Sequence, residues 1–384
     1  MDILKVMRIL AVDVGTGTQD ILLYDSDVEL ENCLKLVMPA PTMLIARRVK
    51  AATRERRPIL LTGVTMGGGP SQWAVEDHVR AGQPVYATPT AARSFNDDLE
   101  VVEREMGIRV ISEDEAEEYQ RRHGQALITL ELKDFDYDAI RAAFAAFGLD
   151  LAPDVLAVAV FDHGNAPPGV SDRQFRFDYL LERIRAQNRL SAFAYLAPDV
   201  PPIMTRMQAV AHTARFDGPV VIMDTAPAAV LGALLDPHVA SHERAFVANV
   251  GNFHTLVFRL GPGGIEGVFE HHTGLITRDR LDTLIERLAE GTLQHEEVFN
   301  DQGHGALVFN TRPAPLDSLA VVGPRRGLMR GSRHRPYFAV PYGDMMLAGC
   351  FGLLRACADL LPQAAPTILE SLGGATRRPP WELL

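Results

Sequence analysis

Cysteine is scarce in this chain, which has three cysteines among 384 residues. Cys33, Cys350 and Cys357 are too few and too scattered for a disulfide framework, and such usage is typical of a reducing cytosol. Long apolar runs are also lacking: residues 220–235 come closest to a membrane span, but an aspartate and a proline interrupt them. The N-terminus lacks the apolar core of a signal peptide. We therefore expect a cytoplasmic protein with no membrane partner.

Positive charge is in deficit. Lys and Arg number 38 against 49 Asp and Glu, so the net charge is −11. A nucleic-acid binder usually carries a basic balance or a basic stripe, and the arginine-rich residues 325–335 form only a short stretch broken by Gly and Pro. We expect no nucleic-acid partner. With 47% hydrophobic and 23% charged residues, the composition is that of a globular protein long enough for two domains.

Apolar strand-like runs alternate with segments of helical periodicity, which predicts an α/β fold. Ser71 is expected as the N-cap of one helix and Thr277 as the N-cap of another. The acidic run at 113–118 is expected to be a solvated helix face. The expected strands are 8–14, 20–24, 58–62, 155–161, 220–223 and 318–322 with a hairpin at 245–260, and the expected helices are 43–55, 71–81, 176–190, 226–235, 278–289 and 344–361.

Two distant segments share one pattern: AVDVGTGTQDILLYD at 11–25 and AFVANVGNFHTLVFRL at 245–260. Each is an apolar run, a polar residue, a glycine-containing turn and a second apolar run, which predicts a β-hairpin. Backbone N–H groups of such turns can point at an anion, and a carboxylate beside a phosphate needs an intervening cation such as Mg²⁺. An ordinary hairpin is the alternative for either segment alone. The candidate residues are Asp13 for the metal, and Gly15, Thr16, Gly17, Thr18, Gly251, Asn252 and Thr255 for phosphate.

Four motifs in one order resemble the superfamily of actin, the sugar kinases and the heat-shock chaperone ATPases. Residues 13–19 and 249–255 resemble its two phosphate hairpins. MDTAPAAVLGALL at 223–235 is similar to its first connecting helix, and LAVVGPRR at 319–326, followed by 340–356, is similar to its adenosine loop and final helix. The resemblance implies a two-lobed actin-like (ribonuclease H-like) architecture with mixed sheets and a nucleotide cleft between the lobes.

The same resemblance implies lobe boundaries, cofactors and roles. The first lobe would be 1–235 plus 345–384, with an inserted segment at about 40–215, and the second lobe 236–344. ATP and Mg²⁺ would lie in the cleft, with Gly323 and Arg325 at the nucleotide. The reaction would be phosphoryl transfer to, or ATP hydrolysis on, an unknown small molecule or protein partner. Catalytic roles are assigned to Asp13 and to Asp162 and Asp224, which each follow or end a predicted buried strand.

The second hairpin departs from the superfamily pattern, because Asn249 stands where an aspartate is usual. Loss of that carboxylate weakens the case for metal-assisted hydrolysis more than the case for phosphate binding. A non-catalytic nucleotide or metabolite sensor that kept the fold is therefore an alternative.

A second group of polar residues follows the second hairpin. Alternation along a strand puts Glu270 and His272 on one face and His271 on the other. With His163 and His304, these residues are candidates for a substrate site using acid–base chemistry. One alternative is that these residues only form hydrogen bonds in a polar core between domains. Another is that they bind the metal of a metal-dependent hydrolase, together with Asp162.

More narrowly, the chain resembles an archaeal and bacterial family marked by GGG, DHG, EHHTG and GHG signatures, here at 67–69, 162–164, 270–274 and 303–305. Some members carry the label pyruvate formate-lyase activating enzyme. Such a radical enzyme needs cysteines clustered as CxxxCxxC for an iron–sulfur cluster, and this chain has no such cluster. The cysteines therefore argue against that chemistry. The GGG turn itself, between a strand and a helix, is either an anion-binding turn or a structural one.

Overall fold

The computed structural model describes residues 6–167 and 169–382. Residues 1–5, 168, 383 and 384 lie outside the described ranges. The first lobe expected at 1–235 plus 345–384 therefore includes residues that the structure does not describe. The fold is mixed α/β with three sheets, two of six strands and one of four. The predicted α/β class is therefore confirmed. Within the described ranges, no helix combines the length and apolar character needed to cross a bilayer.

The first sheet has the strand order β3-β2-β1-β8-β10-β9. β1 to β3 form an antiparallel meander, β8 and β10 continue parallel to β1, and β9 closes the edge antiparallel to β10. Every residue of β8 is buried, as expected for a central strand of an apolar β-branched run. The strands are β1 (Arg8–Val14), β2 (Thr18–Asp25), β3 (Leu34–Pro39), β8 (Val155–Val160), β9 (Ala194–Leu196) and β10 (Val220–Asp224).

The second sheet repeats this arrangement, in the order β14-β13-β12-β11-β15-β16. β11 to β13 form an antiparallel meander, and β15 lies parallel to β11 as β8 lies parallel to β1. The two expected hairpins are thus the first two strands of two similarly built sheets. The strands are β11 (Ala245–Val250), β12 (His254–Gly261), β13 (Gly264–His272), β14 (Gly305–Val308), β15 (Leu319–Val322) and β16 (Tyr337–Phe338).

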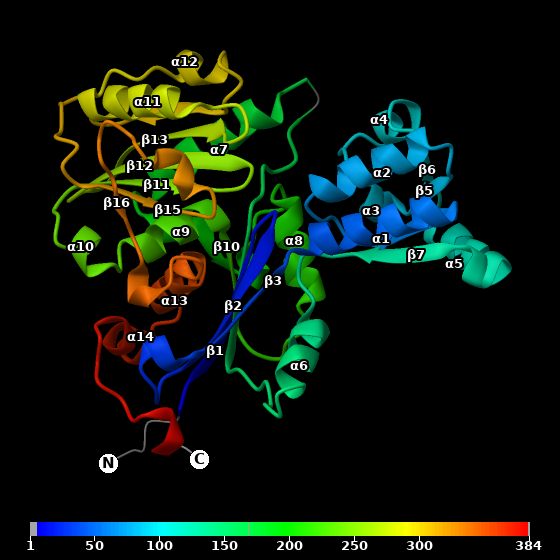
Figure 1. The fold of residues 1–384 in the computed structure, drawn as a ribbon, viewed down its shortest axis with the longest axis horizontal. Helices are drawn as coiled ribbons and strands as arrows, with labels where there is room; N and C mark the ends of the chain where they lie inside the picture. The colour runs from blue at the N-terminus through cyan, green and yellow to red at the C-terminus, as the bar shows by residue number, and fades with distance from the viewer. Residues whose placement is uncertain (1–5, 168, 383–384) are drawn as a thin grey trace.

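The third sheet is parallel, with the order β6-β5-β4-β7 and a hydrophobic cluster of its own. Figure 1 shows it with its helices at the right, in blue to cyan. Its strands are β4 (Ile59–Gly63), β5 (Val85–Ala87), β6 (Arg109–Val110) and β7 (Ile128–Leu132). The helices of this part are α1 (Pro41–Glu55), α2 (Pro70–Arg80), α3 (Pro89–Ala92), α4 (Leu99–Arg104) and α5 (Glu113–His123).

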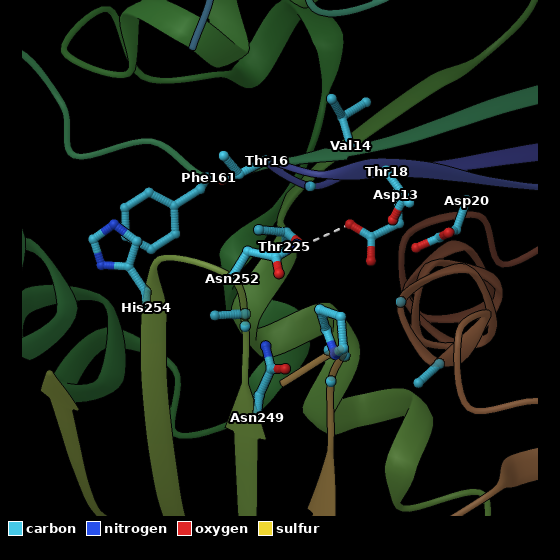
Figure 2. A pocket seen from close by; sticks show the side chains of 18 of the residues that line it. Asp13, Val14, Thr16, Thr18, Asp20, Phe161, Thr225, Asn249, Asn252 and His254 are labelled. Atoms are coloured by element: carbon cyan, nitrogen blue, oxygen red, sulfur yellow. Dashed lines mark hydrogen bonds between the residues drawn. The ribbon is translucent and has the colours of Figure 1, made fainter. Parts of the chain in front are cut away.

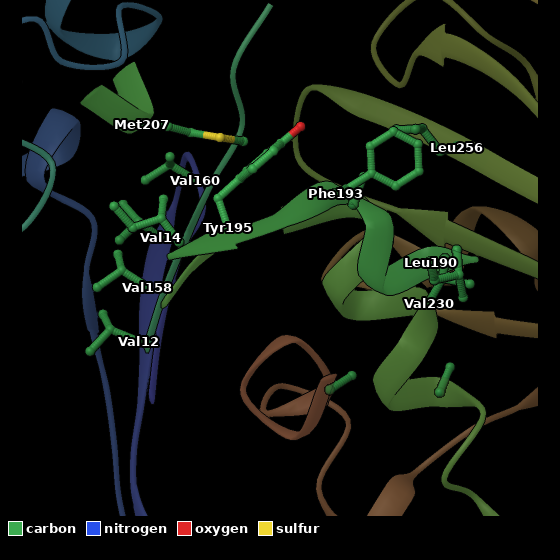
Figure 3. Packing of buried hydrophobic residues seen from close by; sticks show 14 of the residues in the cluster. Val12, Val14, Val158, Val160, Leu190, Phe193, Tyr195, Met207, Val230 and Leu256 are labelled. Carbon is green, nitrogen blue, oxygen red and sulfur yellow. The ribbon is translucent and has the colours of Figure 1, made fainter. Parts of the chain in front are cut away.

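The two six-stranded sheets share one core. A single hydrophobic cluster joins Val158 of the first sheet to Leu256 of the second, together with Phe193 and Val230 (Figure 3). In Figure 1, α9 and α13 lie between the two sheets, and α11 and α12 cover the outer side of the second. The remaining helices are α6 (Tyr137–Ala145), α7 (Asp172–Ala186), α8 (Thr205–Thr213), α9 (Thr225–Ala233), α10 (Pro237–Ala240), α11 (Arg278–Glu290), α12 (His295–Phe299), α13 (Ala348–Leu360) and α14 (Ala365–Leu372).

Three local expectations need correction. Ser71 is not an N-cap: Pro70 takes the first helical position, Gly69 is the cap, and the Ser71 hydroxyl donates to the carbonyls of residues 67 and 68. The helix expected at 176–190 runs from 172 to 186, and the helix expected at 344–361 begins only at 348, after a bend and turn at 345–347. Thr277 caps α11 as predicted, accepting the N–H of Arg280.

Candidate functional site

The turns of the two hairpins lie against each other. The β1–β2 turn holds residues 15–17 and the β11–β12 turn holds residues 251–253. A β-carbon on Gly17 would lie 2.6 Å from Nδ2 of Asn252, so glycine at this position lets the turns meet. Both turns line one cavity of about 110 Å³ (Figure 2). Of the predicted phosphate-binding residues, the cavity is lined by Gly15, Thr16, Thr18, Gly251 and Asn252.

Two carboxylates face the same cavity. Asp13 and Asp20 are direct partners in the β1–β2 ladder, and Figure 2 shows them next to each other. The Thr225 hydroxyl donates to Oδ1 of Asp13 at 2.5 Å, whereas Oδ1 of Asp20 has no hydrogen-bond partner in the described part of the chain. Burial raises the pKa of Asp13 to about 7, and burial together with the Asp13 charge raises the pKa of Asp20 to about 8. Facing carboxylates with an unsatisfied oxygen fit a hard divalent cation such as Mg²⁺.

The first turn of α13 leaves room for this carboxylate pair. A β-carbon on Gly349 would lie 1.9 Å from Oδ2 of Asp13, so only glycine allows the helix this close. Gly349 itself lines the cavity. The amino end of a helix favours negative charge, which suits the position of Asp13.

The second sheet supplies another part of the wall. Asn249, Gly323 and Pro324 line the cavity from the ends of β11 and β15. Gly323 has φ of 98°, and a β-carbon there would lie 2.7 Å from Oδ1 of Asn249. Both the backbone conformation and the close approach therefore require glycine. This is the loop that the sequence predicts at the nucleotide.

Three predicted nucleotide-binding residues do not line this cavity. Gly17 contacts the opposite turn instead. Thr255 is buried, and its hydroxyl lies 2.8 Å from that of Thr273, so it links β12 to the turn that follows β13. Arg325 lines neither of the two cavities described here, and its backbone N–H donates to the Val250 carbonyl.

Both aspartates expected as catalytic bases already have hydrogen-bond donors. Asp162 accepts the N–H groups of Gly164 and Met207, one on each oxygen. Asp224 accepts the N–H of Ala226 as the N-cap of α9 and an Arg176 guanidinium N–H at 2.7 Å. Each carboxylate is buried, and these contacts fix the position of both side chains. The catalytic role expected of Asp162 and Asp224 stays a prediction.

A buried polar group adjoins the cavity. Glu270 lies on β13. Its Oε1 atom is 2.9 Å from Nδ1 of His254 and 3.7 Å from Nδ1 of His304. His304 in turn has Nε2 3.2 Å from Nε2 of His163. Arg176 donates to the other oxygen of Glu270 at 2.8 Å. Glu270, His163 and His304 are thus brought together as the sequence predicts, with His254 added.

Burial sets the protonation of this group. It lowers the pKa of His163 well below its ordinary value and that of His304 to about 3, so both rings are neutral near neutral pH. Burial alone would raise the pKa of Glu270, but Arg176 and the histidines hold it well below its usual range. The group therefore contains an ionised carboxylate behind the neutral imidazoles of His163 and His304.

The two remaining predicted histidines lie on opposite faces of β13. The His272 ring is 4.7 Å from the His304 ring, on the Glu270 side of the strand, and burial lowers its pKa to about 4. His271 points the other way, with Nε2 3.7 Å from a carboxylate oxygen of Asp301. The alternation predicted from the sequence is confirmed, and it excludes His271 from the group around Glu270.

A larger cavity of about 850 Å³ adjoins the small one. The two share Gly15, Thr16, Phe161, Arg206, Phe253 and His254 as lining residues. The GGG turn lines the larger cavity, together with His163 and with residues 93–98 from the part that carries the third sheet. Such a volume suits a small-molecule ligand, whereas the small cavity suits a cation with phosphate.

Four residues of the site were missed by sequence reasoning. Asp20 could have been found, because an antiparallel hairpin with a turn at 15–17 pairs it with Asp13. His254 could have been found from the second hairpin, where it pairs with His272. Arg206 and Arg176 carry no local signal: each lies on a helix far along the chain from the carboxylate that it binds, Asp134 and Glu270 respectively.

The fold and site together define a mixed α/β protein with two similarly built sheets and a carboxylate-lined cavity between glycine turns. A family model matches residues 66–328, and the chain belongs to that family, which is described as "Putative pyruvate format-lyase activating enzyme (DUF1786)". No curated protein matches.

The three cysteines are buried, and within the described ranges none belongs to a metal-binding group. The cysteines thus supply no cluster site for the chemistry in that description.

Solved structures with some similarity include three with 9–13% identity. The PPX-GPPA enzyme of Aquifex aeolicus is 10% identical over 93% of both chains, with a TM-score of 0.23. A carbohydrate kinase from Novosphingobium aromaticivorans is 13% identical over 98% of this chain and 93% of its own, with a TM-score of 0.22. A ROK family transcriptional regulator, a homolog of the E. coli MLC protein, is 9% identical with a TM-score of 0.23, over 67% of this chain. The chain spans only 38% of that regulator. At these TM-scores the similarities carry no argument.

Proposed function

We propose that the protein binds a nucleoside triphosphate with Mg²⁺ between its two hairpin turns and transfers or hydrolyses the terminal phosphoryl group. The observation that carries this proposal is that both glycine turns line one cavity together with Asp13 and Asp20. A phosphate chain needs backbone N–H donors and a cation on the carboxylate side, and this cavity offers a place for each. ATP is the nucleotide that we expect.

Each wall of the cavity has a role in this proposal. Asp13 and Asp20 would hold Mg²⁺, which supplies charge neutralisation for the phosphates when bound. The turn amides at 15–18 and 251–252 would hold the phosphates, and Gly323 would lie near the nucleoside. Arg206 lines both cavities, with Nε and Nη2 paired to Asp134 at 2.7 and 3.0 Å. A guanidinium fixed in this way can stabilise charge on a phosphoryl group between the two cavities.

The acceptor would occupy the larger cavity. It has the volume of a small-molecule site and adjoins the turns, so a hydroxyl or water bound there could approach the terminal phosphoryl group. We also propose that the repeated sheet order reflects an actin-like, two-lobed architecture, with 1–235 plus 345–384 as one lobe and 236–344 as the other. The third sheet lies at 59–132, inside the segment of about 40–215 that we regard as an insertion.

Calorimetric titration of the full chain with Mg-ATP tests the binding step. Asp13→Asn and Asp20→Asn should each weaken binding at least tenfold, which is about 1.4 kcal/mol. Asp217→Asn is the matched control, because Asp217 is exposed and lies outside the cavity lining. Equal affinity for all four proteins, or no binding by the unchanged chain, would refute the proposed site.

Release of inorganic phosphate distinguishes an enzyme from a sensor. We expect the unchanged chain to turn over ATP slowly, because Asn249 replaces a carboxylate in the cavity wall. Asn249→Asp should raise the rate of phosphate release if that carboxylate aids metal-assisted hydrolysis. Tight Mg-ATP binding with no release, and with release gained only in Asn249→Asp, would assign the natural protein to the sensor class.

A further inference from the structure

Three imidazoles from separate parts of the chain converge beside the larger cavity. His163 follows β8, His254 begins β12 and His304 precedes β14. One ring nitrogen from each lies within 4.8 Å of the others. Figure 2 shows the His254 ring stacked on Phe161, at a centroid distance of 4.1 Å, which fixes its orientation. Among the described residues this is the one group with the spacing of a metal site.

The spacing of two of these nitrogens matches shared coordination. Nε2 of His163 and Nε2 of His304 are 3.2 Å apart. Two nitrogens bound at 2.0–2.1 Å to one tetrahedral ion are separated by about 3.3 Å. The rings therefore need little movement to bind one ion.

Glu270 takes the position of an outer-shell partner. Its Oε1 lies beside Nδ1 of both His254 and His304, on the ring nitrogens opposite those that would bind an ion. A carboxylate behind a metal-bound imidazole fixes the tautomer and leaves Nε2 as the ligand atom. Glu270 and His304 are both fully buried, so this orientation is imposed by the core.

The buried charges also favour a cation here. Arg176 forms ion pairs with Asp224 and with Glu270, and all three side chains are at most 1% exposed. Two carboxyl groups and one guanidinium group thus lie buried behind the imidazoles. Such a polar surrounding is better suited to a bound cation than an apolar core is.

We propose that His163, His254 and His304 bind one transition-metal ion of the Zn²⁺ class, without the carboxylates of Asp13 and Asp20. Imidazole ligands suit Zn²⁺, Co²⁺, Ni²⁺ or Cu²⁺, whereas Mg²⁺ prefers oxygen. His163 and His254 line the larger cavity, so the position left open by three protein ligands faces it. The ion would there coordinate an oxygen or nitrogen atom of the molecule that occupies this cavity. The ligand set differs from the sequence prediction, since it includes His254. Of the residues predicted there, it leaves out Asp162, Glu270, His271 and His272.

The test is metal binding by the full chain after removal of metal with a chelator. Refilling with Zn²⁺ should load one equivalent, and Co²⁺ should give the intense visible absorption of a low-symmetry site. His163→Gln and His254→Gln should abolish both signals, and Glu270→Gln should weaken affinity about 10- to 100-fold. His212→Gln is the matched control, because His212 is exposed and outside the group.

Two further measurements distinguish loss of the metal site from misfolding and from failure of the nucleotide proposal. Circular dichroism of each metal-free variant shows whether it folds, and the partly exposed His163 offers a substitution that disturbs the core least. Asp13→Asn should load as much Zn²⁺ as the unchanged chain, so failure of the nucleotide proposal leaves this one standing. Absence of stoichiometric loading in the unchanged chain, or equal loading in folded His163→Gln and His254→Gln, would overturn the metal site and leave the cluster as a polar core.

Discussion

Gly232 of α9 and Gly352 of α13 meet where the two helices cross between the sheets. A β-carbon on either glycine would lie 3.0 Å from the backbone nitrogen of the other. The same β-carbons would lie 1.8 Å from the Ala348 carbonyl oxygen and 1.9 Å from that of Ala228, respectively. The two helices thus pack backbone against backbone, which brings Gly349 and the carboxylate of Asp13 together one turn away.

Gly232→Ala and Gly352→Ala should each destabilise the protein. Alanine favours a helix by about 1 kcal/mol over glycine, but the overlap with a carbonyl oxygen forces the helices apart and costs more. We expect a net loss of about 1–3 kcal/mol in the free energy of unfolding, measured by urea denaturation. Gly327→Ala is the control, since apart from its chain neighbours no atom of residues 6–167 or 169–382 lies within 4 Å of its β-carbon position. Stability of all three variants at or above that of the unchanged chain would contradict the packing.

Gly349→Ala should impair ligand binding more than it impairs folding. Its β-carbon would displace the Asp13 carboxylate, which lies 1.9 Å from the ideal position. We expect Mg-ATP affinity to fall at least tenfold, or about 1.4 kcal/mol, by calorimetry. Gly327→Ala again serves as the control. Unchanged affinity in a folded Gly349→Ala protein would mean that Asp13 does not hold the metal.

The contribution of Asp13 and Asp20 to the stability of the metal-free protein should fall as the pH rises, and it shows most clearly above about 6.5, where His163, His272 and His304 are neutral in both the folded and the unfolded state. The pKa values of Asp13 and Asp20 are raised by burial to about 7 and about 8, against 3.8 for an ordinary aspartate. Between pH 3.8 and about 8, Asp13 and Asp20 bind more protons in the folded state than in the unfolded state. Their ionisation in this range therefore lowers the free energy of unfolding. Asp224, Asp344 and Cys350 face the pair and add no positive charge.

Urea denaturation in chelator across this pH range measures the effect. Asp20→Asn should flatten the decline, since one of the two groups no longer ionises, whereas Asp217→Asn should keep it. Added Mg²⁺ should stabilise the unchanged chain more at high pH than at low pH. Parallel profiles for the unchanged chain and Asp20→Asn would show that these carboxylates do not titrate as a pair.

Arg206→Lys should lower turnover more than binding. Lysine cannot keep the two-point contact with Asp134 and also present a planar guanidinium to a phosphoryl group. We expect kcat for phosphate release to fall roughly 10- to 1000-fold, with a smaller change in KM for ATP. Arg141→Lys, at an exposed arginine of α6, is the control. A change confined to KM would make Arg206 a binding residue only.

The elements of this fold were predictable where apolar periodicity is strong. The buried strands at 8–14 and 155–160 and both hairpins follow from apolar runs that end in glycine turns. Alternation along β13 placed Glu270 and His271 on opposite faces because a strand has a period of two. Ser71 failed as a cap because the preceding proline occupies the first helical position.

The site was predictable only in part, because its members come from different segments. The turn residues carry their own signal in glycine and threonine. Arg176 and Arg206 do not, since their partners are fixed by tertiary packing and an arginine on a helix is ordinarily exposed. The contacts of Asp162 and Asp224 with buried donors likewise depend on where tertiary packing places α7, α8 and α9.

A crystal structure of the full chain with Mg²⁺ and a non-hydrolysable ATP analogue tests the central claim most directly. The account predicts the phosphates between residues 15–18 and 251–252, with Mg²⁺ on the side of Asp13 and Asp20. An analogue bound elsewhere, with both turns free of phosphate, would contradict it.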